Sequence, residues 1–111
     1  MPTADEWIVQ LRNLTGGEQR LRVLAILAEH DTPIYHEDIR DTFTTLDWNF
    51  HPTGLSKVLR ELETDGYITG DVPQDRRRGR AVRYTLNRDA INKVFNAART
   101  GLRLDQDVES R

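Results

Sequence analysis

The chain has 111 residues, enough for one small domain, and its 16 Lys and Arg nearly balance 18 Asp and Glu at a net charge of −2. This balance excludes a uniformly basic nucleic-acid coat, although it leaves room for a local basic face. The sequence contains no cysteine, which excludes disulfides and thiolate catalysis, and it contains neither a signal peptide pattern nor an apolar run of membrane-spanning length, so we expect a cytoplasmic chain with no membrane partner.

Two amphipathic helices are predicted at the start of the chain. Thr3 and Glu6 have the spacing of a capping box, and the apolar residues that follow at helical intervals predict a helix over residues 4–14. A second capping-box spacing after a Gly-Gly break predicts another helix over residues 18–30. Apolar residues cover more than one face of this second helix, so we expect it to be central in the fold.

The next part of the sequence predicts three short elements. Pro33 ends the preceding helix, and residues 34–35 are compatible with a very short strand. Residues 36–43 predict a short helix with two large apolar side chains four positions apart. The connection over residues 44–51 holds three large apolar side chains, so we expect it to pack against the domain.

The clearest helix is predicted over residues 53–65, where four aliphatic residues form one core stripe. Polar residues that can bond to DNA bases or phosphates lie off that stripe near the start of the helix. The alternative interpretation is a solvated face, in which an arginine pairs with a nearby carboxylate. The candidate contact residues of this helix are Thr53, Ser56, Lys57 and Arg60.

A β-hairpin with a basic tip is predicted next, with residues 67–72 and 82–86 as its strands and residues 73–80 as its turn. Residues 1–50 hold four basic and nine acidic residues, whereas residues 76–88 hold six arginines and no acid. Mutual repulsion within such a cluster is relieved by a polyanion, and arginine binds phosphate bidentately. A solvated turn is the alternative. The candidate contact residues are Arg76, Arg77, Arg78, Arg80 and Arg83.

The chain is predicted to end with a helix over residues 87–99, for which Asn87 is the expected N-cap, and a polar tail over residues 105–111. Four apolar residues of this helix, Ile91, Val94, Phe95 and Ala98, fall on one stripe. The predicted elements therefore form a single domain over residues 1–104.

Two stretches carry a family resemblance. Residues 53–68 (TGLSKVLRELETDGYI) resemble the recognition helix and first wing strand of bacterial winged helix-turn-helix transcription regulators. Residues 78–87 (RGRAVRYTLN) resemble the second half of their wing. The pattern is most similar to the ArsR-like group, with MarR-like regulators a near relative. The resemblance implies a mainly α fold with a small β-hairpin, in the order α-α-(β)-α-α-β-β-α.

The resemblance also implies a function. In such regulators the helix at 53–65 would read the major groove of double-stranded DNA, while the wing at 73–80 would contact the backbone or minor groove. It implies a homodimeric transcription regulator on a roughly palindromic operator, in which the N-terminal and C-terminal helices pair across the two-fold axis. We expect a repressor rather than an activator, because 111 residues hold no separate activation domain. The apolar residues that fit this dimer interface are Trp7, Ile8, Leu11, Leu14, Ile91, Val94 and Phe95.

The sequence departs from this family in two ways. The connection before the recognition helix is longer and more aromatic than the usual tight turn. The sequence therefore fixes neither the residue at which that helix begins nor whether residues 44–51 shape a ligand pocket. The metal-sensing cysteines of many ArsR-like proteins are absent, and the three histidines, His30, His36 and His51, match no compact metal motif. We therefore expect no metal and no cofactor.

Enzymatic activity is not expected, because Ser56 lies in no nucleophile elbow and the chain has no phosphate-cradling glycine loop with a lysine. Two alternatives to a repressor stay open. One is a winged-helix module that holds a protein partner, which the acidic first half and the apolar terminal helices favour. The other is a plasmid or phage replication or partition protein, which would share the DNA contact.

Overall fold

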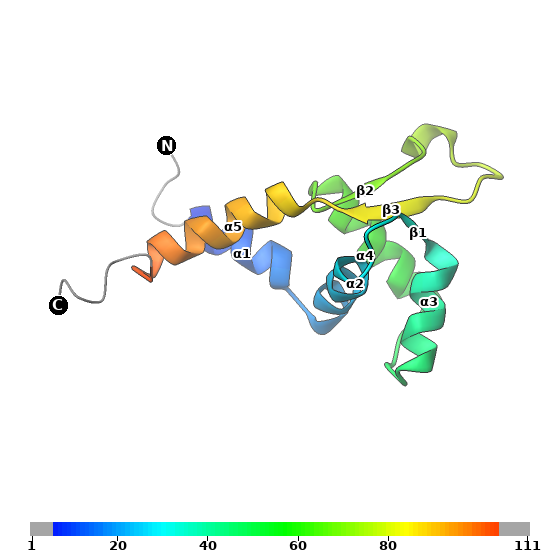
Figure 1. Cartoon of the computed structure of the whole chain (residues 1–111), viewed down its shortest axis with the longest axis horizontal. Helices are drawn as coiled ribbons and strands as arrows, with labels where there is room; N and C mark the ends of the chain where they lie inside the picture. Colours follow the sequence, from blue (N-terminus) through cyan, green and yellow to red (C-terminus); the bar gives the residue numbers. More distant parts are fainter. Residues whose placement is uncertain (1–5, 105–111) are drawn as a thin grey trace.

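The computed structural model describes residues 6–104, so the predicted cap Thr3, the predicted helix start at residue 4 and the tail over residues 105–111 lie outside the described residues. The described part is mainly helical, with five α-helices and a small antiparallel sheet (Figure 1). This confirms the predicted mainly α fold with a small hairpin. The elements in chain order are α1 (Glu6–Thr15), α2 (Glu18–Ala28), β1 (Ile34–Tyr35), α3 (His36–Thr45), α4 (Pro52–Thr64), β2 (Ile68–Gly70), the 3-10 turn η1 (Gln74–Arg76), β3 (Arg83–Leu86) and α5 (Arg88–Gly101).

The helix ends differ from the predicted ends by a residue or two. Helix α3 continues to Thr45, past the predicted end at residue 43, because residues 44 and 45 include no proline or glycine that would end it. The chain leaves the helical conformation at Asp47, whose φ is 55°. Helix α4 begins at Pro52, a residue suited to the first turn because it has no N–H to leave unpaired. It ends as predicted before Gly66, whose φ of 87° favours glycine.

The sheet has the strand order β1-β3-β2, with both pairs antiparallel. The pair β2–β3 is the predicted hairpin, with Ile68 opposite Leu86. The predicted short strand at residues 34–35 is confirmed, and it joins the other edge of β3 through Ile34 opposite Tyr84. This second pair fixes the start of α3 beside the hairpin.

The core lies where α2, α3 and α4 pack together and against the sheet. The predicted stripe of α4 is buried at Leu55, Leu59 and Leu62. The predicted packing of the 44–51 connection is confirmed, because its Trp48 and Phe50 rings lie edge-on to buried Phe43 with centroids 5.4 and 5.5 Å away. The core therefore fixes α4 with its polar side outward.

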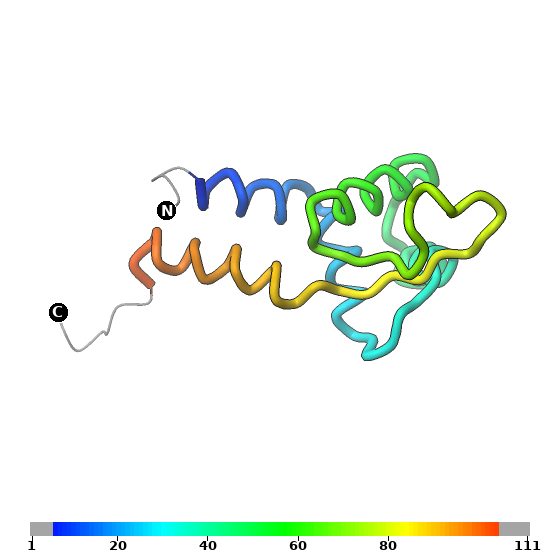
Figure 2. Tube along the Cα trace, turned by 90° about the horizontal axis from the view of Figure 1, so that it is seen from above, coloured from blue at the N-terminus to red at the C-terminus, as the bar shows by residue number. Residues whose placement is uncertain are grey.

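Helices α1 and α5 pack side by side and extend away from the rest of the domain, opposite the hairpin (Figure 2). We call this pair the arm. The Trp7 ring lies against Gly101 so closely that a Cβ at that glycine would clash with it. No helix of the described residues is both long enough and apolar enough to cross a bilayer.

Candidate nucleic-acid interface

The exposed side of α4 carries a polar stripe. Thr53, Lys57 and Arg60 follow one another at spacings of four and three residues, so they share one face of the helix, and all three are exposed. Ser56 is half-buried at the edge of this face. Within the described part of the chain, neither Lys57 nor Arg60 forms a salt bridge. The predicted alternative of an Arg60–carboxylate pair is therefore not what the structure has.

The hairpin arginines fall into two groups. Arg77 donates hydrogen bonds to the Glu63 carboxylate and, over 2.9 Å, to the Val72 carbonyl, so its guanidinium is bound within the chain. The guanidinium of Arg83 is likewise bound within the chain, at 2.7 Å from the Asp71 carboxylate. Neither Glu63 nor Asp71 is among the residues that the sequence pattern predicts as partners of these arginines.

The second group has no such partners. The three remaining arginines are exposed, and none of them forms a salt bridge to another described residue. They lie on the turn between β2 and β3, at the end of the molecule opposite the arm (Figure 1). This group, which we call the free wing arginines, consists of Arg76, Arg78 and Arg80.

Glu63 joins α4 to the hairpin. Besides Arg77, its carboxylate accepts hydrogen bonds from the backbone N–H of Gly70 (3.2 Å) and from the side-chain amide of Gln74 (3.3 Å). Burial opposes ionisation of this carboxyl, but the bonds from Arg77, Gln74 and Gly70 outweigh it and hold the pKa of Glu63 below its usual value. A side chain at Gly70 would crowd the same carboxylate, since its Cβ would lie 2.8 Å from a Glu63 oxygen.

The position of Glu63 in the sequence is itself a sign of this ion pair. It lies seven residues after Ser56 and three after Arg60, both helical spacings, so it lies on the flank of α4 next to the candidate contact residues. A carboxylate on that flank, followed by an arginine-rich hairpin, predicts an internal ion pair.

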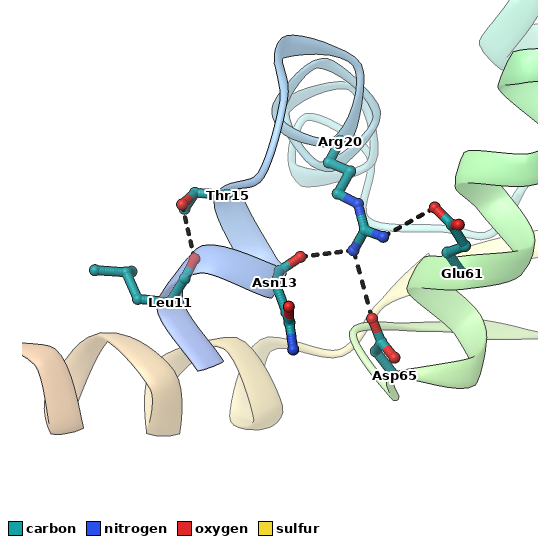
Figure 3. Close-up of polar contacts among 6 residues, drawn as sticks. All are labelled: Leu11, Asn13, Thr15, Arg20, Glu61 and Asp65. Carbon is teal, nitrogen blue, oxygen red and sulfur yellow. Dashed lines mark hydrogen bonds and ion pairs between the residues drawn. The ribbon is translucent and has the colours of Figure 1, made fainter. Parts of the chain in front are cut away.

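A second ion-pair cluster fixes α4 to the other helices. The guanidinium of Arg20 on α2 donates to the Asn13 carbonyl (2.6 Å), and to Glu61 (2.9 Å) and Asp65 (3.4 Å) at the end of α4 (Figure 3). Only 17% of the Arg20 side chain is exposed. The end of α1 and helices α2 and α4 are therefore held together at one point, which links the orientation of α4 to the base of the arm.

The connection before α4 does shape a hollow. Asn49, Phe50 and His51 line it together with the α1–α2 turn and α4, and its volume is about 610 Å³. The Gln19 side chain in its wall donates to the Asn49 carbonyl over 2.7 Å, while the buried Gln19 Oε1 has no hydrogen-bond partner among residues 6–104.

The predicted dimer residues separate into buried and exposed groups. Leu14 and Val94 are buried in the core, so these two offer no surface to a second copy. The reason is that α1 and α5 pair with each other within one chain. Ile8 and Phe95 remain 48% and 43% exposed on the arm. The half-buried members of the predicted set are Trp7, Leu11 and Ile91.

The described residues contain no group of three or more His, Cys, Asp or Glu side chains that could hold a metal ion. Comparison of the chain with family models, with curated proteins and with solved structures found no match.

Proposed function

We propose that this chain is a sequence-specific double-stranded DNA-binding transcription regulator, a homodimeric repressor of the winged helix-turn-helix type. One observation carries the proposal. The exposed polar stripe of α4 lies next to the hairpin that holds the free wing arginines, and Glu63 bonds the helix and the hairpin together. Such regulators place one helix in the major groove and a neighbouring hairpin, whose cationic side chains reach the flanking backbone, beside it.

The two elements would divide the recognition. Helix α3 would support α4, and the first turns of α4 would enter the major groove, where Thr53, Lys57 and Arg60 meet base edges or phosphates. The free wing arginines would contact the flanking backbone or the minor groove, where the potential is most negative. Phosphate contacts fix the register of the protein, and base contacts supply the sequence preference.

The arm fits the role of a dimer interface. It extends from the domain on the side away from the hairpin (Figure 2), so two copies joined through their arms would leave both hairpins free. Two-fold symmetry would then present two α4 helices to a palindromic site. Exposed Ile8 and Phe95 supply apolar surface for this contact, and the same arm exposes Val9, Leu102 and Leu104.

The test is selection of bound duplexes from a random pool, followed by titration of the selected duplex by fluorescence anisotropy at several salt concentrations. We expect the binding constant to fall steeply with salt, because each phosphate contact releases counterions. The mass of the free protein is measured alongside by light scattering. If no selected duplex binds at low salt, and DNA from upstream of the gene does not bind either, the proposal is wrong.

A protein-binding module is the second candidate, and one observation favours it. The exposed residues Glu37, Asp38 and Asp41 of α3, a helix that begins beside the hairpin, would repel a DNA backbone and attract a basic partner. Saturable binding of a defined basic protein, by a chain that ignores all DNA, would favour this candidate. A replication or partition protein would instead retain DNA binding and differ in its operator.

A further inference from the structure

A second hollow lies where α3 begins, between α4 and the hairpin. Its volume is about 280 Å³. Its walls come from three segments that are distant in the sequence, and four of its residues belong to no predicted site. The lining residues are His36, Ser56, Leu59, Arg60, Gln74, Arg77 and Tyr84.

The hollow is rich in hydrogen-bond donors. Among the described residues, no carboxylate lines it. The hydroxyl groups of Ser56 and Tyr84 make no hydrogen bond within the described part of the chain, and the Arg60 guanidinium is unpaired there. These groups are therefore available to a bound acceptor.

The nearest acid is already neutralised. Glu63 accepts from Arg77 and Gln74, which uses its charge and fixes both side chains in the wall of the hollow. Arg77 commits its Nε to the Val72 carbonyl and one terminal nitrogen to Glu63, and its second terminal nitrogen bonds to none of the residues that the structure describes.

His36 contributes a hydrogen bond rather than charge at neutral pH. Burial, and then the positive charge of Arg40, keep the pKa of His36 below its usual value. The ring nitrogens can donate or accept, according to the tautomer. Because Arg77 is paired with Glu63, the net positive charge of the hollow comes from Arg60.

We propose that this hollow, the phosphate pocket, binds a phosphate group, to which Arg60 supplies charge, while Ser56, Gln74, Tyr84 and the second terminal nitrogen of Arg77 supply hydrogen bonds. The assignment to a phosphate of the DNA backbone rests on the proposed function; the pocket itself does not. A phosphate bound there touches α4 and the hairpin at once, so it aligns both elements on one nucleotide step. Arginine forks and hydroxyl donors are the groups that bind phosphate in proteins.

The first experiment uses inorganic phosphate and the full-length, ¹⁵N-labelled chain at constant ionic strength. We expect saturable shifts of the amide signals of Ser56, Arg60 and Tyr84. Arg60→Gln should weaken this binding at least about fivefold, the loss of about one charge-assisted hydrogen bond. Arg99→Gln, a change of an exposed arginine on the arm, is the matched control and should leave the phosphate affinity unchanged.

The second experiment measures duplex DNA binding by the variants Ser56→Ala and Tyr84→Phe, each of which removes one hydroxyl group. The melting temperature checks that each variant keeps the fold. We expect each variant to bind every duplex about threefold to tenfold more weakly than the wild type. If the occupant is a DNA phosphate, saturating DNA also abolishes the shifts caused by inorganic phosphate. Phosphate shifts that persist in the DNA complex instead assign the pocket to free phosphate.

The outcomes separate the pocket from the proposed function. Saturable phosphate shifts in a chain that binds no DNA would support the pocket and overturn the DNA-binding proposal. Wild-type DNA affinity in both hydroxyl variants, together with unshifted pocket amides on adding phosphate, would overturn the pocket and leave DNA binding standing. A chain that shows neither phosphate shifts nor DNA binding would overturn both.

Discussion

The guanidinium of Arg77 in the hairpin donates a hydrogen bond to the carboxylate of Glu63 in the last turns of α4, and 20% and 14% of the two side chains are exposed. This pair makes the α4 flank and the hairpin one unit before any ligand is bound. For a DNA-binding protein, such preorganisation lowers the cost of ordering the hairpin at the moment of binding.

The first prediction concerns the stability that this pair supplies. Glu63→Gln should lower the free energy of unfolding by about 1–2 kcal/mol, because Arg77 and Gln74 lose a charged acceptor in a largely buried place. Urea unfolding measures the change. The matched control is Glu18→Gln, since Glu18 is 82% exposed and its ion pair is with Arg22 one helical turn away.

That control should change the stability by less than about 0.5 kcal/mol, the usual effect of an exposed helix pair. Equal losses in the two variants would contradict a structural role for Glu63.

The second prediction is a pH dependence with a definite sign. The pKa of Glu63 lies below its ordinary value of 4.5, since the bonds from Arg77 and its other donors outweigh burial. A carboxyl with a lowered folded pKa stabilises the protein above its unfolded pKa, and this contribution is lost as the pH falls through the folded value. Wild type should therefore lose more stability below pH 4.5 than Glu63→Gln loses. Urea unfolding at a series of pH values measures the difference, and parallel curves would contradict the prediction.

The third prediction concerns the arm. Gly101→Ala places a methyl group against the Trp7 ring and should destabilise the chain by about 1–3 kcal/mol, the usual cost of overpacking. Thermal unfolding followed by tryptophan fluorescence reports the change. Gly54→Ala is the control, because its Cβ would lie 3.5 Å from the His51 Cβ, an ordinary contact, and alanine favours the helix by up to about 1 kcal/mol. An equal loss in both variants would exclude a specific Trp7–Gly101 contact.

Local patterns were sufficient to predict most elements. The spacing of Leu55, Leu59 and Leu62 predicts which side of α4 is buried, and the structure confirms it. The partner of β1 was not predictable in this way. Ile34 pairs with Tyr84, and a pairing over such a sequence distance depends on how the intervening helices pack.

The candidate site was predictable in composition but not in detail. Sequence analysis treated five hairpin arginines alike, because charge counts carry no information about neighbours. Arg77 and Arg83 are distinguished only when the fold brings Glu63 and Asp71 beside them. In the same way, Tyr84 joins the phosphate pocket only because the sheet places β3 next to α4 and α3.

The fourth prediction separates the two groups of arginines by the salt dependence of DNA binding. Arg78→Gln should reduce the slope of log K against log salt by about 0.9, because one phosphate contact and its released counterion are lost. Arg83→Gln should instead reduce stability with a smaller change of slope, because Arg83 is bound to Asp71. Arg99→Gln, on the arm, is the control for a change of net charge. Equal slopes for Arg78→Gln and Arg99→Gln would remove Arg78 from the interface.

The last prediction tests the arm as the dimer interface. Phe95 is 43% exposed, so Phe95→Glu should not disturb the core but should place a charge in the apolar contact between two copies. We expect light scattering to give the mass of one chain and the melting temperature to change little. DNA affinity should fall at least tenfold, because a single chain binds only one half-site. Leu46→Glu is the control, since Leu46 is 50% exposed at the end of α3 and away from the arm. If Phe95→Glu remains a dimer while Leu46→Glu becomes monomeric, the interface lies on α3 instead, and the two α4 helices would need a different relative placement on DNA.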